Sequence, residues 1–337
     1  MSTSAPMSSV SSHPTLAPAP AEPAGASSVP PLRPRLVRAE LRKIFTTSTW
    51  WVIGLFVLIS TGLTLLVNTL EANQRLGAAE QLRRHPPDFS NAPPGQRPSA
   101  SEQQAILEDF ARRTDIPAIV AEQAANVFTS GQFLGLMLIV ILGVLVVTNE
   151  FTHQTATPTF LATPRRTRVI LAKLVAAMVL AAGYWAVSTA ISVGSGVLNF
   201  SLRGYDVPFT AMQVWRPVAM NLLAYVLWAV LGVGFGVLIR NQLGATLTAA
   251  GLYLIGLPSA LLVFGFIHAY IVHSDVVWNF IVAVPGVASM VMVSVEPPRF
   301  GPEQTGVPWW IGALVLTAYG VLAGTIGTLI TRRRDIS

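Results

Sequence analysis

The ionisable side chains with the most suggestive spacing lie in one short polar segment between two apolar runs. Residues 149–173 read NEFTHQTATPTFLATPRRTRVILAK, with Glu150 near the start and Lys173 at the end. A carboxylate close to several cations can form ion pairs, so we expect Glu150 to pair with Arg166, Arg168 or a basic helix elsewhere in the chain. Alternatively, these arginines belong to an ordinary membrane-proximal loop and bind lipid headgroups.

The sequence lacks the residue patterns of common catalytic centres. A phosphate-binding P-loop needs a glycine directly before a lysine, but the two lysines follow Arg42 and Ala172. The chain has no cysteine, and it has no GxSxG motif. No catalytic, cofactor-binding or metal-binding residue is therefore predicted. A metal site at His268, His273 and Asp275 is only a minor alternative, because their spacing does not place them on one helical face.

The composition is that of a membrane protein with several spans. The 337 residues are 52% hydrophobic and 11% charged, whereas a soluble domain carries about 25% charged residues. The apolar residues form runs of about 20, the length that crosses the hydrocarbon core of a bilayer. The sequence predicts an all-α polytopic membrane protein with six transmembrane helices, at residues 50–70, 129–148, 174–198, 218–239, 243–267 and 308–330.

None of these six runs contains Asp, Glu, Lys, Arg or His. Proton-driven transporters place such residues at membrane depth, so proton coupling is not expected, while sodium binding by backbone carbonyls remains open. Energy is then expected to enter from a separate protein chain that pushes on a short cytoplasmic element. Residues 149–173 fit this role, with a brief helix at residues 152–161 that Pro164 ends.

Two further regions flank the first span. Residues 1–34, rich in Ser, Pro and Ala, are predicted to form a disordered cytoplasmic tail before a transmembrane domain at residues 35–337. Residues 35–48 are predicted to form a basic amphipathic interface helix that carries Arg38, Arg42 and Lys43, or else a plain extension of the first span. Residues 71–128 are predicted to be an outer loop that contains a helix capped at Ser101.

The distribution of basic residues predicts the orientation in the membrane. With six spans and both termini in the cytoplasm, 13 of the 22 Lys and Arg residues lie in cytoplasmic segments. Residues 276–295 form a further uncharged stretch that Pro285 and Gly286 interrupt, and a seventh span there would place the basic C-terminal residues on the outer side. We therefore expect a re-entrant or broken helical pair at the outer surface before the last span.

Glycines recur at four-residue spacing in three of the predicted spans. This spacing allows close approach of helices, either within one subunit or between subunits. The pairs are Gly131 and Gly135, Gly232 and Gly236, and Gly320 and Gly324.

From Arg35 onward the sequence resembles the permease subunits of bacterial type-2 ABC exporters. The resemblance rests most on the segment from residue 149 to residue 173, where the family has a Glu closing the second span, then Gly-Thr, Thr-Pro, Arg and Lys. The family glycine is replaced here by Gln154. The matching positions are Glu150, Thr155, Thr163, Pro164, Arg168 and Lys173.

The resemblance implies a role for each of these positions. In the family this segment is a coupling helix that docks on the ATPase, and a second contact lies between the fourth and fifth spans, here Arg240 to Gly244. It further implies a dimer, homomeric or with a sister permease, in a bacterial cell membrane, bound to ABC-type ATPase subunits that carry the ATP and magnesium. No cofactor is expected in this chain and no nucleic-acid partner.

The implied function is export of an amphipathic substrate, such as a drug, antibiotic, lipid or glycan precursor. The chain itself is not expected to be an enzyme. The alternative is a membrane scaffold, an immunity or signalling component that binds an ATPase without transporting. A membrane-embedded enzyme would need polar chemistry in the spans, which the sequence lacks.

Overall fold

The computed structural model describes residues 34–89, 98–152, 166–239, 241–296, 298–300 and 305–333. The chain divides into two units, Met1–Pro31 and Leu32–Ser337, and all described residues belong to the second. The predicted disordered tail therefore lies outside the described residues, apart from Pro34.

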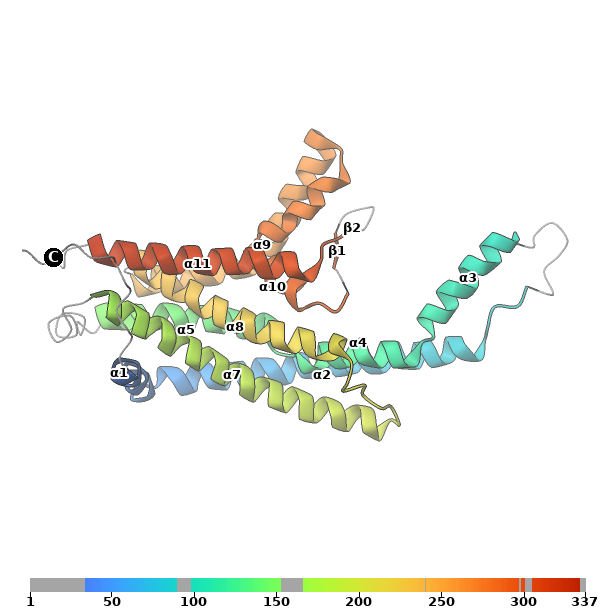
Figure 1. The fold of residues 1–337 in the computed structure, drawn as a ribbon, viewed down its shortest axis with the longest axis horizontal. Helices are drawn as coiled ribbons and strands as arrows, with labels where there is room; N and C mark the ends of the chain where they lie inside the picture. The colour runs from blue at the N-terminus through green and yellow to red at the C-terminus, as the bar shows by residue number, and fades with distance from the viewer. Residues whose placement is uncertain are drawn as a thin grey trace, which may run out of the picture. The chain divides into compact units, whose positions relative to one another are not determined.

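The described residues are almost entirely helical (Figure 1). The longer helices are α1 (Pro34–Phe45), α2 (Thr49–Arg84), α3 (Ala100–Arg113), α4 (Ile116–Phe128), α5 (Gln132–Thr152), α7 (Arg166–Leu202), α8 (Met212–Leu238), α9 (Gln242–Ile267), α10 (Pro285–Val293) and α11 (Trp309–Arg333). Two shorter helices follow α9, the π-helix η1 (His268–Val272) and the 3-10 helix η2 (Asp275–Ala283). A two-residue antiparallel pair, β1 (Arg299–Phe300) and β2 (Thr305–Gly306), precedes α11.

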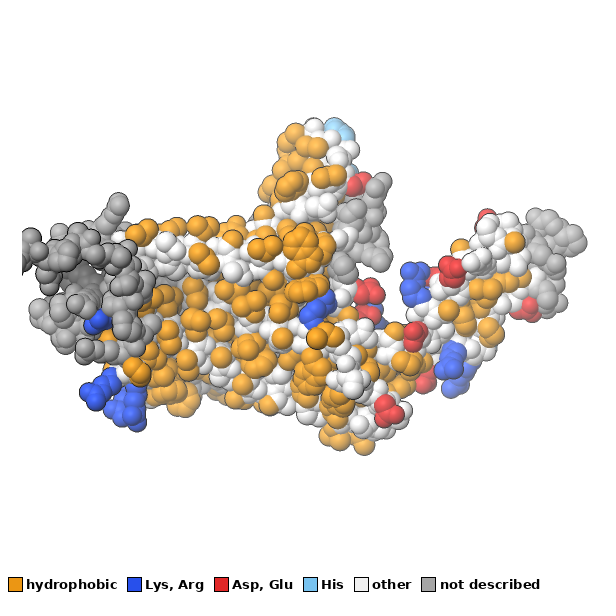
Figure 2. Space-filling view, viewed as in Figure 1, with side chains coloured by type: hydrophobic (Ala, Val, Ile, Leu, Met, Phe, Trp, Pro, Cys, Tyr) orange, Lys and Arg blue, Asp and Glu red, His pale blue; other side chains and the backbone are white. Residues whose placement is uncertain are grey.

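Six of the described helical segments are long and apolar enough to cross a membrane, which confirms the predicted all-α polytopic fold. On the face drawn in Figure 2, hydrophobic side chains cover the length of the bundle and most charged side chains lie toward its ends. We call the end at which α1 lies the α1 end, and the end at which α4 meets α5 the α4 end. Figure 1 shows α1 nearly end-on, so it lies across the direction of the long helices, as an interface helix would.

Helix α8 is at the centre of the bundle, where it packs against α5, α7 and α11. Glycines allow the closest of these contacts, because a Cβ on Gly143 of α5 would lie 2.9 Å from the Cα of Gly232 of α8. The other glycines of the predicted four-residue spacings also face neighbours in the same chain, such as Gly320 against Leu227. This spacing therefore serves packing within one subunit.

The region predicted as an outer loop is mostly helical. Helix α2 runs 14 residues beyond the predicted end of the first span, and α4 packs against it and against α7 and α8. These contacts bury a second apolar core: Ala72, Leu76, Val120, Ala121, Ala124, Val127, Phe128, Phe200, Val214 and Val218. The predicted cap at Ser101 is wrong, because the Ser99 side chain and Glu102 form the capping box of α3. The single helix expected there divides at Thr114 and Asp115.

The predicted broken pair before the last span is confirmed. Helices η2 and α10 are bent by 97° at Val284, where Pro285 begins a new helix. Arg216 of α8 fixes the end of this pair by donating to the carbonyl oxygens of Ser294 and Val295 at 2.7 and 2.9 Å. Its guanidinium also lies 5.2 Å from the ring centre of Trp309, at the start of α11.

The contact between α5 and α8 predicts a sharp difference between two glycine substitutions. In Gly232→Ala the added methyl would overlap the carbonyl oxygen of Val140, so we expect a loss of about 1–3 kcal/mol of stability. The matched control is Gly62→Ala in α2, where a Cβ meets nothing within 4 Å, and alanine should stabilise the helix by about 0.5–1 kcal/mol. Thermal unfolding in detergent measures both effects. Equal melting temperatures for the two variants would contradict the proposed packing.

Candidate functional site

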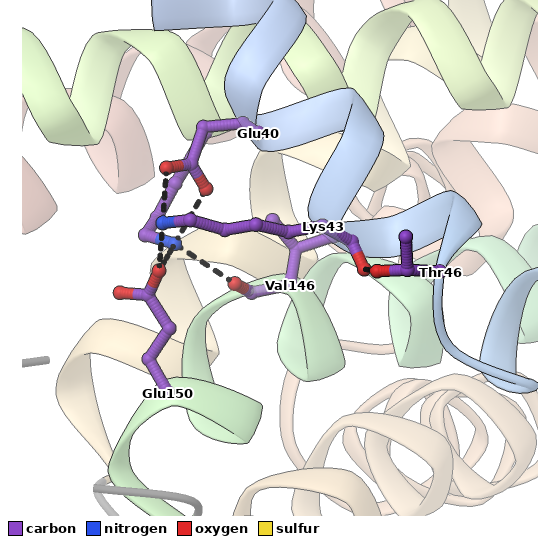
Figure 3. Close-up of polar contacts among 6 residues, drawn as sticks. Glu40, Lys43, Thr46, Val146 and Glu150 are labelled. Carbon is purple, nitrogen blue, oxygen red and sulfur yellow. Dashed lines mark hydrogen bonds and ion pairs between the residues drawn. The ribbon is translucent and has the colours of Figure 1, made fainter. Parts of the chain in front are cut away.

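The structure gathers four charged side chains at the α1 end into a closed ring. Glu40 and Lys43 come from α1, Glu150 from the last turns of α5, and Lys173 from the second turn of α7. In Figure 3, Glu40, Lys43 and Glu150 bring their charged ends together between α1 and α5. Because α1 is amphipathic, Leu41 and Ile44 pack on the bundle core, and this contact brings Glu40 of the same helix inward.

Charges of opposite sign alternate around this ion ring. Lys43 Nζ lies 2.8 Å from Glu40 Oε1 and 2.8 Å from Glu150 Oε1. Lys173 Nζ lies 2.9 Å from Glu40 Oε2 and 2.8 Å from Glu150 Oε1, and it donates to the carbonyl oxygen of Val146 at 3.3 Å. Two acids and two bases leave the ring with no net charge.

The ring is largely shielded from solvent. The side chains of Glu40, Glu150 and Lys173 are 8%, 10% and 3% exposed. Burial raises the pKa of Glu40, but the charge of Lys173 and hydrogen bonds from Lys43 and Lys173 outweigh burial and hold this pKa below its ordinary value. Burial lowers the pKa of Lys43, but hydrogen bonds to Glu150 and Glu40 raise it above its ordinary value. Both groups are therefore ionised at neutral pH.

Such a ring joins three helices that are distant in the sequence. Ion pairs buried in this way gain little net stability over apolar residues, but the loss of one member leaves an unbalanced buried charge that costs several kcal/mol. The ring therefore fixes the position of α1 against the end of α5 and the start of α7. These are the two helices on either side of residues 153–165.

The predicted coupling residues divide into three groups. Glu150 and Lys173 are in the ring, where Glu150 pairs with Lys43 of the basic helix, one of the three alternatives considered, and with Lys173, which was not among them. Arg168 lies half-buried in the first turn of α7. Thr155, Pro164 and Arg240, together with most of the segment that carries the family pattern, lie outside the described residues.

The remaining residues of the interface helix have different environments. Arg38 and Arg42 are exposed on α1, as expected for the polar face of an amphipathic helix. Glu40, the acid that completes the ring, was not predicted. It is the only acidic residue within the basic stretch 35–48, and that isolation was the available signal.

The resemblance implies two contacts with the ATPase, at residues 149–173 and at residues 240–244. The helices beside these two segments, α5 and α9, contact each other. Gln242, in the first turn of α9, lies close to the end of α5, and its Nε2 donates to Asn149 Oδ1 at 3.1 Å. Asn241 caps α9 by accepting from the backbone N–H of Gly244 at 2.8 Å. The start of α9 and the end of α5 are thus tied together beside the ion ring.

Two surface hollows are relevant to binding. A groove of about 310 Å³ runs beside the ion ring and is lined by α1, the start of α2 and the end of α5. A cleft of about 330 Å³ lies at the α4 end, where α2, the α4–α5 junction, α9 and α10 meet. The His268 Nε2 atom lies 3.2 Å from Asp275 Oδ1, and in the described part of the chain no three acidic, His or Cys side chains form a metal-sized group.

The six apolar helices and the broken helical pair define a multi-pass membrane protein. The sequence profile of the ABC-2 family transporter proteins matches residues 35–275, so the chain belongs to the ABC-2 transporter family. It is therefore a membrane permease of an ABC transporter. The transmembrane subunits of the ABC-2 family are generally non-catalytic and associate with an ABC ATPase subunit. A search among curated proteins found no match.

The ring predicts that Lys173→Met is strongly destabilising. The two carboxylates would then share only the partly exposed Lys43, and we expect a loss of about 3–5 kcal/mol of stability. Adding Glu40→Gln removes one negative charge and should restore part of this loss. Thermal unfolding of the purified variants measures both effects, with exposed Arg42→Gln as the control; a double variant less stable than Lys173→Met would contradict the ring.

The same ring should stabilise the protein over a defined pH range. The lowered pKa of Glu40 means that its contribution to stability is present above the ordinary value of 4.5 and is lost as the pH falls through the folded-state pKa. The raised pKa of Lys43 means that its contribution is present below 10.5 and is lost as the pH rises through its folded-state pKa. The difference in melting temperature between the native chain and Glu40→Gln should therefore be constant near neutral pH and shrink below pH 4.5.

Proposed function

We propose that this permease exports an amphipathic substrate, with energy supplied by a separate ABC-type ATPase that acts on residues 149–173 and on Arg240. The observation that carries the proposal is the ion ring of Glu40, Lys43, Glu150 and Lys173. It ties the interface helix to both helices that flank the proposed docking segment.

The connections of the docking segment support transmission of force. Helix α5 ends at Thr152 and α7 begins at Arg166, so the residues between them are covalently attached to two spans. Helix α5 packs closely on α8, and the bond from Gln242 to Asn149 adds α9. A displacement of the segment would therefore reach α5, α7, α8 and α9 together, with α1 following through the ring.

The assembly that this proposal requires contains more than one chain. Two permease copies, identical or sister subunits, would bind two ATPase subunits that hold ATP and magnesium. The chain would lie in a bacterial cell membrane with both termini in the cytoplasm, which places the α1 end on the cytoplasmic side. The exposed Arg38 and Arg42 of α1 fit that side, since basic residues accumulate there and meet anionic lipids.

The test of this proposal measures ATP-driven transport rather than protein stability. In a permease–ATPase complex purified together in mild detergent and reconstituted into vesicles, Arg168→Gln should lower ATP-driven transport at least tenfold while membrane-inserted protein stays near the native amount. Glu150→Gln should lower transport to the same extent per folded complex, because the loss of this ring member also reduces the amount of folded protein. The exposed Arg42→Gln is the matched control and should transport normally.

Two results would count against the proposal in different ways. Normal transport by both variants would show that residues 149–173 are not the coupling segment. Stable binding of an ATPase with no transport of any amphipathic compound by the native complex would favour the scaffold alternative.

A further inference from the structure

The cleft at the α4 end has a polar lining within an otherwise apolar bundle. Its walls come from α2, from the junction of α4 and α5, from α9 and from α10. Glu71 at its edge is 20 residues beyond Trp51, which corresponds to about 30 Å along α2. Trp50 and Trp51 are exposed, as expected of membrane-interface anchors. The cleft therefore lies near the opposite boundary of the hydrocarbon layer.

The lining is rich in uncharged hydrogen-bonding groups. Asn68, Gln123, Asn126 and Gln132 contribute amides, and Thr129 is one of several residues that contribute hydroxyls. Polar groups near hydrocarbon are costly unless they are hydrogen-bonded to protein, water or a ligand. So many amides in one cleft indicate a site for a molecule that can both donate and accept hydrogen bonds.

The protein itself satisfies only part of this lining. Asn68 Nδ2 donates to the carbonyl oxygen of Asn126 and to Ser130 Oγ, both at 3.0 Å, and Gln132 Nε2 donates to the carbonyl oxygen of Ser289 at 3.2 Å. These bonds use the amino groups of Asn68 and Gln132. Within the described residues, their amide oxygens and the whole side-chain amide of Asn126 make no hydrogen bond, so they are free to bind a ligand.

The one charged side chain of the cleft already has a partner outside it. No Lys or Arg is among its described lining residues, and its one carboxylate, Glu71, lies 3.0 Å from Arg75 Nη2. The C-terminal end of α4 and the N-terminal end of α5 meet in the cleft, so their opposite partial charges offset each other. The positive N-terminal end of α10 faces the same cleft as the Glu71 carboxylate. A phosphate therefore finds no cation among the described lining residues, and a quaternary ammonium finds only a carboxylate that Arg75 already pairs.

Apolar groups complete the site on one side. The rings of Phe133 and Tyr253 lie 5.4 Å apart between centroids, and Leu257 and Met290 line the same wall. Ligand sites commonly combine apolar and aromatic walls with a few polar groups that fix the orientation of the ligand. This wall can hold the carbon skeleton of a head group or the first part of an alkyl chain.

We infer that this cleft binds an uncharged, hydrogen-bonding head group of the amphipathic substrate, and that it discriminates against phosphate-headed and ammonium-headed molecules of the same tail. The inference rests on the proposed export function for the source of its ligand. Binding itself requires neither ATP nor a working ATPase.

The test uses three probes with the same eight-carbon chain. The permease–ATPase complex in lipid nanodiscs, without nucleotide, is photolabelled with a diazirine derivative of octyl glucoside below its critical micelle concentration. Labelling of peptides from the α4–α5 junction and α10 should be saturable. Unlabelled octyl glucoside should compete at least tenfold better than octyl phosphate or octyltrimethylammonium.

One variant separates binding from folding. Asn126→Leu removes an exposed side chain that makes no hydrogen bond within the described chain, and it should lower cleft labelling about fivefold. Gln213→Leu, an exposed amide outside this cleft, is the matched control and should label like the native chain. Equal competition by all three probes, or undiminished labelling of Asn126→Leu, would overturn the inference. Selective labelling in a complex that does not transport would overturn the proposed export function and leave this binding site standing.

Discussion

A buried charge must have a partner, and this requirement organises the α1 end of the protein. Lys173 is almost fully buried in a bundle whose spans are otherwise apolar, and a buried charge is costly unless groups of opposite charge lie beside it. Glu150 comes from the neighbouring span, while Glu40 comes from a helix outside the spans. The need to balance Lys173 therefore recruits α1 to the bundle, and Lys43 closes the ring by balancing the second acid.

The fold follows from the sequence where one physical requirement dominates. The spans could be predicted because about 20 apolar residues are needed to cross the hydrocarbon core of a membrane. The break at Pro285 could be predicted because proline cannot continue a preceding helix. The extension of α2 was missed because its sequence is more polar than a span, and the packing of α4 was missed because Glu122, Gln123 and Asn126 interrupt its apolar residues. Their helical spacing was nevertheless present, with Ala72, Leu76 and Ala79 on one face of α2.

The site was only partly predictable for a different reason. Glu150 and Lys173 stand out because they are charges at the ends of apolar runs. Their connection through Glu40 joins residues 133 positions apart, and no local pattern encodes such a pairing. The polar cleft was likewise not predicted, because its amides come from α2, α4 and α5 and converge only after folding.

The length of α2 has a mechanical consequence. This helix has 36 residues, so as a straight rod it would measure about 54 Å. Three residues join it to α1, and Trp50 Nε1 stiffens this corner by donating to the carbonyl oxygen of Phe45 at 3.1 Å. A rotation of the corner by about 5° would displace the far tip of such a rod by about 5 Å. A small rotation of α2 at one membrane surface would thus displace the opposite end of this helix by several ångströms at the other surface.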